Sequence, residues 1–121
     1  MKPVRPYYSQ AVSVEGAKKL IFVSGQTWDP KLGGVARENA GEQAEFLLEN
    51  MKAILEASGA TMEDIVKVTF YLTSMEDLEA IAQVRFRYFR KSPPSSTLVE
   101  VSNLWHPDVL GEIDAFAVAD S

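Results

Sequence analysis

Few side chains in this sequence could carry out a reaction, and its acids are the first of them. Asp114 lies in an alternating segment, 112–116, where its carboxylate faces either solvent or a cleft. In a cleft it could orient a water molecule or take a proton from it. Glu100 is a second acid, and a paired-carboxylate site of the glycosidase kind stays open, because the sequence does not fix the separation of the two carboxylates.

Cysteine chemistry is excluded and histidine chemistry is limited. The chain has no cysteine and one histidine, which excludes a thiolate nucleophile, a disulfide framework, a Cys-based zinc site and a His–His acid–base pair within one subunit. The histidine, His106, lies in a turn-like Trp-His-Pro segment and is expected at the surface or at an interface. No serine-hydrolase triad is available, and we predict neither a metal nor a cofactor.

Two polar segments are candidates for ligand binding. Ser95, Ser96 and Thr97 follow two prolines and could form the hydroxyl-rich floor of a pocket. Ser24, Gly25 and Gln26 follow an apolar run, and they form either a tight turn or a backbone donor with a hydroxyl group at a cleft.

One cation and three aromatic residues add to the candidates. Arg85 interrupts the apolar stripe of a helix. Either its stem covers apolar surface while its head pairs with an acid at the edge, or it supplies a cation for a ligand. Tyr7, Tyr8 and Trp105 could line a pocket wall, although aromatic packing at a subunit contact is the safer interpretation.

The spacing of apolar residues predicts the elements that position these side chains. A helix is expected from Asn39, its N-cap, to Gly59, and a second from Ser74 to about Lys91, ended by two prolines. Strands are expected at 11–14, 20–23, 65–73, 97–101 and 113–118, with a further short strand near Val35. The fold class is therefore α+β, a two-layer sandwich in which two helices cover one face of a sheet of about five or six strands. The other face needs a partner, so we expect oligomerisation through the sheet.

Length and charge narrow the class of protein. The chain has 121 residues and a net charge of −5, which indicates one domain, 1–121, and argues against nucleic acid as the main partner. The N-terminal segment has no apolar run of the signal-peptide kind, and no segment is long enough to span a membrane. We therefore expect a cytoplasmic protein.

Three parts of the sequence resemble those of one family. They are Tyr8–Val12 followed by Ile21–Gln26; the helix that contains Glu42 and Gln43, running through 54–59 to Ile65–Thr69; and Pro94–Val101 followed by Glu112–Ala117. Each segment alone is weakly specific, but together they cover nearly the whole chain in the right order. The sequence is thereby similar to the Rid superfamily, also called YjgF.

The resemblance implies a chorismate-mutase-like fold and a homotrimer with ligand clefts between adjacent subunits. It also implies hydrolysis of 2-imino acids, or their enamines, to 2-keto acids and ammonia. In the family an arginine grips the substrate carboxylate and a glutamate handles the attacking water, and the matching positions here are Ser96 and Asp114. Backbone groups of 24–26 and near Leu98 would help to hold the ligand. Ser96 carries no charge and cannot replace a bidentate guanidinium clamp.

Two classes of function follow. The first is a cofactor-free hydrolase or deaminase of an imine, an enamine or a related small carbonyl compound, with Asp114 positioning the water. In it, Ser96 and Thr97 would select a ligand with hydroxyl or amide groups, unless Arg85 replaces the missing cation. The second is a non-catalytic trimer that binds a small metabolite. A ribonuclease is disfavoured by the acidity of the chain and its single histidine.

Overall fold

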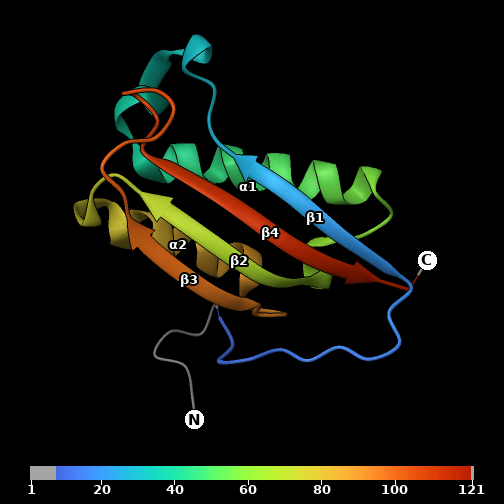
Figure 1. Cartoon of the computed structure of the whole chain (residues 1–121). Helices are drawn as coiled ribbons and strands as arrows, with labels where there is room; N and C mark the ends of the chain where they lie inside the picture. Colours follow the sequence, from blue (N-terminus) through green and yellow to red (C-terminus); the bar gives the residue numbers. More distant parts are fainter. Residues whose placement is uncertain (1–7, 121) are drawn as a thin grey trace.

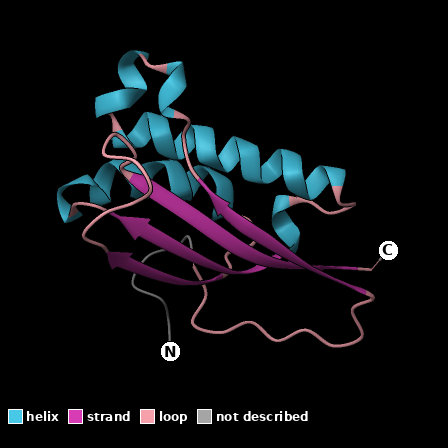
Figure 2. Ribbon diagram, turned by 45° about the horizontal axis from the view of Figure 1, so that its top comes forward, coloured by secondary structure: helices cyan, strands magenta, loops and turns pink. Residues whose placement is uncertain are grey.

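The computed structural model describes residues 8–120 and contains one mixed sheet with two helices on one of its faces (Figures 1 and 2). The strands are β1 (Lys19–Gln26), β2 (Ile65–Leu72), β3 (Ser95–Glu100) and β4 (Gly111–Ala119), and the helices are α1 (Ala40–Ala57) and α2 (Leu78–Phe89). The strand order is β1-β4-β2-β3. Only the β2–β3 pair is parallel, because α2 connects these two strands, whereas β4 is antiparallel to both β1 and β2. The predicted α+β sandwich is confirmed.

Local sequence signals set the helix ends. The side chain of Asn39 accepts a hydrogen bond from the backbone N–H of Glu42 (3.0 Å), so the predicted N-cap of α1 is confirmed. At the other end Gly59 adopts a positive φ of 84°, as expected of a glycine that stops a helix. The second helix ends at Phe89, two residues before the expected Lys91, and a short 3-10 helix, η4 (Met75–Asp77), precedes it.

The predicted five or six strands are too many, since the described residues form a sheet of four. The expected strand at 11–14 is absent, and residues 11–18 are exposed, without regular secondary structure. This segment starts beside β3, where Ser9 makes a single parallel bridge with Ser95, and ends beside β4, where Lys18 N–H donates to the carbonyl of Ala119. The hairpin prediction failed because this segment crosses the end of the sheet instead of pairing with β1 (Figure 1).

The region near Val35 is also not a strand. It forms a 3-10 helix, η2 (Gly34–Glu38), after a shorter one, η1 (Pro30–Leu32). Two glycines in this region have positive φ values, Gly33 at 60° and Gly34 at 78°, which is not extended strand backbone. The expectations for the N-terminal segment 1–7 lie outside the described residues.

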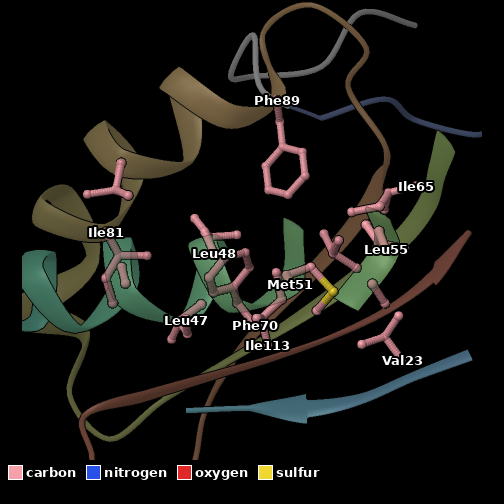
Figure 3. Packing of buried hydrophobic residues seen from close by; sticks show 14 of the residues in the cluster. Val23, Leu47, Leu48, Met51, Leu55, Ile65, Phe70, Ile81, Phe89 and Ile113 are labelled. Carbon is pink, nitrogen blue, oxygen red and sulfur yellow. The ribbon is translucent and has the colours of Figure 1, made fainter. Parts of the chain in front are cut away.

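The core lies between the helices and the sheet (Figure 3). From α1 it includes Leu47, Leu48 and Met51, which pack toward Phe70 of β2 and Ile113 of β4. Each fully buried side chain of this kind contributes about 1.5–3 kcal/mol. The strict alternation expected for the strand at 65–73 does not hold at its start. A β-bulge between Ile65 and Lys67 turns Ile65, and not Val66, into the core.

The buried face of α2 differs from the expected stripe at three positions. Val84 is buried, whereas Leu78 and Tyr88 are half-buried. The Tyr88 hydroxyl donates a hydrogen bond to the Glu49 carboxylate of α1. Among the described residues no helix is long and apolar enough to cross a membrane.

Candidate functional site

A pocket opens at the β3 edge of the helix-covered face. It has a volume of about 240 Å³ and is lined by Tyr8, Leu78, Arg85, Ser96 and Leu98. We call it the Arg85 pocket. Helix α2 supplies Leu78 and Arg85, strand β3 supplies Ser96 and Leu98, and the chain before residue 10 supplies Tyr8. Three apolar or aromatic walls surround a cation and a hydroxyl group, which is the composition of a small-ligand site.

The guanidinium of Arg85 is the main polar feature of this pocket. Only 2% of Arg85 is exposed, so the interpretation that its head reaches the edge of the molecule is wrong. Its Cζ lies 4.2 Å from the centroid of the Phe70 ring, and its Nη2 donates a hydrogen bond to Ser96 Oγ (2.5 Å). A guanidinium in the wall of a pocket can bind an anionic ligand in the adjoining space through charge-assisted hydrogen bonds.

A second group of polar residues lies on the open face, the face of the sheet that the helices do not cover. Tyr71 pairs with Glu112 across the β2–β4 ladder, and its hydroxyl donates to Asp114 Oδ2 (2.9 Å). Glu112 and Asp114 are two residues apart on β4, so they share a face of the sheet and their Cα atoms are about 7 Å apart along the strand. The structure thus provides a carboxylate pair, with Glu112 in the place where the sequence analysis considered Glu100.

The two carboxylates are not equivalent. Burial, and to a lesser degree the negative charge of Asp114, raises the pKa of Glu112 above its ordinary value. The hydrogen bond to Asp114, together with burial, raises the pKa of the Tyr71 hydroxyl, which therefore stays protonated and keeps donating to Asp114. Glu112 is consequently a carboxyl group whose pKa lies above its ordinary value, while Asp114 is held in place by the hydroxyl of Tyr71.

Gly25 explains why Glu112 can take this position. A Cβ atom at residue 25 would lie 1.9 Å from Glu112 Oε2 and 2.8 Å from its Cδ. Only a residue without a side chain therefore lets the Glu112 carboxylate lie against the backbone of β1. The neighbouring Gln26 is occupied locally, since its Nε2 donates to the carbonyl of Ser24 (3.0 Å). The predicted segment 24–26 thus contributes backbone beside an acid, and Ser24 is exposed.

The predicted site residues fall into two groups on opposite faces of the sheet. Ser96 pairs with Val68, whose side chain is in the core, whereas Asp114 pairs with Thr69 on the open face. Thr97 points to the open face as well, where its hydroxyl accepts a hydrogen bond from Lys67 Nζ (2.7 Å). Within one chain the structure therefore does not bring Ser96 and Thr97, or Ser96 and Asp114, into one pocket.

Sequence reasoning missed Glu112 and the polar role of Tyr71. Glu112 was treated only as a neighbour of Asp114, although its i, i+2 spacing from that residue was a signal that both share a face. Glu100, which was considered as the second acid of a carboxylate pair, has another role in the structure. Its carboxylate accepts a hydrogen bond from the backbone N–H of Met75 (2.8 Å) at the start of η4. Among the described residues no group of three or more histidine, cysteine, aspartate or glutamate side chains could hold a metal ion.

Comparison with known proteins places this chain in one family. Residues 2–119 match the family described as Endoribonuclease L-PSP. A RutC family protein from Pyrococcus horikoshii is 44% identical over 117 residues, which cover 96% of this chain and 89% of the relative. The crystal structure of RidA from a Psychrobacter species is similar with a TM-score of 0.72 and 34% identity, over 92% of this chain and 87% of that chain.

The chain therefore belongs to the Endoribonuclease L-PSP family, which includes the YjgF, RutC and Rid proteins. This confirms the family resemblance that the sequence segments indicated. A relative of named activity, the human 2-iminobutanoate/2-iminopropanoate deaminase, is 32% identical over 112 residues, which cover 92% of this chain and 79% of the relative.

Proposed function

We propose that this protein is a cofactor-free hydrolase of small imines or enamines that carry a carboxylate, and that Arg85 binds that carboxylate. The observation that carries the proposal is the buried guanidinium of Arg85, which lines the Arg85 pocket beside Ser96. A guanidinium can bind a carboxylate through two charge-assisted hydrogen bonds, which a serine hydroxyl cannot do. Similarity to the human deaminase supports the reaction class.

The proposed reaction adds water across a carbon–nitrogen double bond. A carboxylate of the Glu112–Asp114 pair takes a proton from the water molecule while the water oxygen attacks the imine carbon. The imine nitrogen gains a proton in the same step. The resulting carbinolamine then breaks its carbon–nitrogen bond, which gives a keto acid and ammonia. Glu112 suits the proton transfers because its raised pKa brings it nearer to neutral pH.

The reaction needs two copies of the chain at each site. The Arg85 pocket lies on the helix-covered face and the carboxylate pair on the open face, so one copy cannot present both to one small molecule. The open face also exposes large apolar side chains: Phe22 is 68% exposed and Phe116 45% exposed, and their ring centroids lie 5.1 Å apart. We therefore propose a homotrimer in which the ligand lies where the pocket of one subunit meets the carboxylates of the next.

The direct test measures ammonia release from freshly generated 2-iminopropanoate, against its decay in buffer. The wild-type protein should accelerate release. Arg85→Gln should raise KM by about 30-fold or more, since losing a charged hydrogen-bonded contact costs about 2–5 kcal/mol. Arg85→Lys keeps the charge and should recover part of the loss, and Ser96→Ala should have a small effect. Thermal melting of each variant shows whether it is folded.

A mixing experiment tests whether two copies form the site. At substrate concentrations below the wild-type KM, Arg85→Gln and Glu112→Gln should each show little activity alone, but refolding them together should restore activity, because some clefts then combine an intact Arg85 with an intact Glu112. If wild-type protein gives no acceleration at high concentration yet binds pyruvate in an Arg85-dependent manner, the chain is a binding protein instead of an enzyme.

A further inference from the structure

A second pocket lies beyond the end of β1, and it shares no lining residue with the Arg85 pocket. Two segments form it: Asp29, Pro30 and Lys31 after β1, and Trp105, His106 and Asp108 in the connection between β3 and β4. Its volume is about 260 Å³. We call it the Trp105 pocket. Figure 1 shows the two segments side by side beyond the end of β1.

The indole of Trp105 is exposed but fixed. Its exposed fraction is 63%, and its Nε1 donates a hydrogen bond to Thr27 Oγ1 (2.9 Å). Its ring also meets the His106 ring edge to face, with centroids 5.5 Å apart. Contacts with polar or aromatic neighbours, and not burial in the core, therefore hold this large ring in place at the surface. A ring held in this way loses little conformational entropy when a ligand binds to it.

A buried glutamine holds the backbone on both sides of the pocket. Gln43 of α1 is fully buried, and its Nε2 donates to the carbonyls of Asp108 and Ala36 (2.8 Å each). Its Oε1 accepts from the backbone N–H of Leu110 (2.8 Å). The segment that follows Trp105 is thus tied to the main helix, so the Trp105 pocket is part of the rigid fold.

The histidine of this pocket is set in one tautomer. The backbone N–H of Asp108 donates to His106 Nδ1 (3.0 Å). Because Nδ1 accepts this bond, the proton of the neutral ring lies on Nε2. In that state His106 adds no positive charge, and the carboxylates of Asp29 and Asp108 outnumber the single ammonium of Lys31 among the pocket residues.

We propose that the Trp105 pocket binds a small organic cation, an amine or a quaternary ammonium group. The indole ring attracts a cation through its π electrons, and the carboxylates of Asp29 and Asp108 attract it by charge. The volume suits a ligand the size of a free amine with a short substituent. The net charge of −5 adds a long-range attraction for cations. This site is independent of the proposed hydrolase activity.

The test uses choline and its uncharged isostere, 3,3-dimethylbutan-1-ol, as probes at constant ionic strength. Two-dimensional NMR of the full chain should show choline shifting the Trp105 indole and the 105–108 amides saturably, while the isostere does not. The indole of Trp28, which is 1% exposed, reports any global change. Trp105→Ala should weaken choline binding by about threefold or more, measured on the amides, as expected for loss of a cation–π contact.

A matched pair of variants separates local from long-range charge. Asp29→Asn removes the charge but keeps an oxygen that can accept from the Lys31 N–H, as Asp29 does now (2.9 Å). Asp64→Asn makes the same change in a capping residue that does not line the pocket. Asp29→Asn should weaken choline binding at least about twofold, and Asp64→Asn should leave it unchanged. Equal effects of the two variants, equal shifts by both probes, or no saturable shift would overturn the proposal.

Discussion

Replacing Gly25 with alanine should separate the position of the Glu112 carboxylate from the stability of the fold. The new Cβ would lie 1.9 Å from Glu112 Oε2, whereas ordinary contact begins at 3.4 Å, so the oxygen must move by about 1.5 Å. It lies at the end of a flexible side chain and can move without displacing backbone. Gly25 does not have a positive φ, and alanine gains about 0.5–1 kcal/mol over glycine in a strand. The variant should therefore stay folded, with a free energy of unfolding within about 1 kcal/mol of wild type.

Activity should respond much more strongly than stability. A misplacement of about 1 Å can cost about 100-fold in rate, so Gly25→Ala should lower kcat for ammonia release by about that factor and change KM little. The double variant Gly25→Ala/Glu112→Gln should be no worse than Glu112→Gln alone, because both changes act on one carboxylate. The assay combines ammonia release with urea denaturation. A Gly25→Ala protein with wild-type kcat would refute the assignment of Glu112, and additive losses in the double variant would show that Gly25 acts through something else.

Three further predictions concern stability. The folded-state pKa of Glu112 is raised above 4.5, so the folded protein binds this proton more tightly than the unfolded chain and loses stability as the pH rises from 4.5 through the folded-state pKa. Glu112→Gln should therefore match wild type in melting temperature near pH 4 and exceed it at pH 7. A constant difference between the two proteins across this pH range would contradict a raised pKa of Glu112. Gln43→Leu leaves three backbone groups without their partner and should lower the free energy of unfolding, measured by urea denaturation, by about 3 kcal/mol or more. The control variant Gln83→Leu, at an exposed position, should change it by less than about 0.5 kcal/mol. Tyr71→Phe removes the donor to Asp114 and should cost about 1 kcal/mol in the same assay; an unchanged midpoint would mean that the bond is not populated in solution.

The elements predicted best are those whose signals are local. The cap at Asn39, the apolar spacing that follows it and the stop at Gly59 all act within a few residues, and α1 forms where they indicate. The strand at 11–14 failed because an apolar alternation is compatible with pairing but does not specify a partner. In the folded chain β1 pairs with β4, the last strand in the sequence, on one side only, and residues 11–18 do not pair with its other side.

The functional residues were harder to predict because they depend on which face of the sheet each side chain takes. The sequence alone left Asp114 open between solvent and cleft, and it could not show that Glu112 has room against β1, since the contact with Gly25 joins residues 87 positions apart. The placement of Arg85 was also undecided, because an arginine in an apolar stripe is compatible with both an exposed head and a buried one. The partners that settle it, the buried Phe70 and the half-buried Ser96, come from the strands β2 and β3.

In the proposed site, Arg85 supplies a cation to the ligand although it does not lie on the strand that lines the pocket. Ser96 is short enough to leave space beside β3, and the guanidinium of Arg85 reaches that space from α2, over the Phe70 ring. A longer side chain at position 96 would compete with the guanidinium for the same volume, so the two residues are coupled. Introducing arginine at position 96 while Arg85 remains would place two like charges side by side in one pocket, whereas Ser96→Arg together with Arg85→Ser exchanges them. Activity in the exchanged double variant, and its loss in Ser96→Arg alone, would mean that the pocket needs one guanidinium at this place and that either element can provide it.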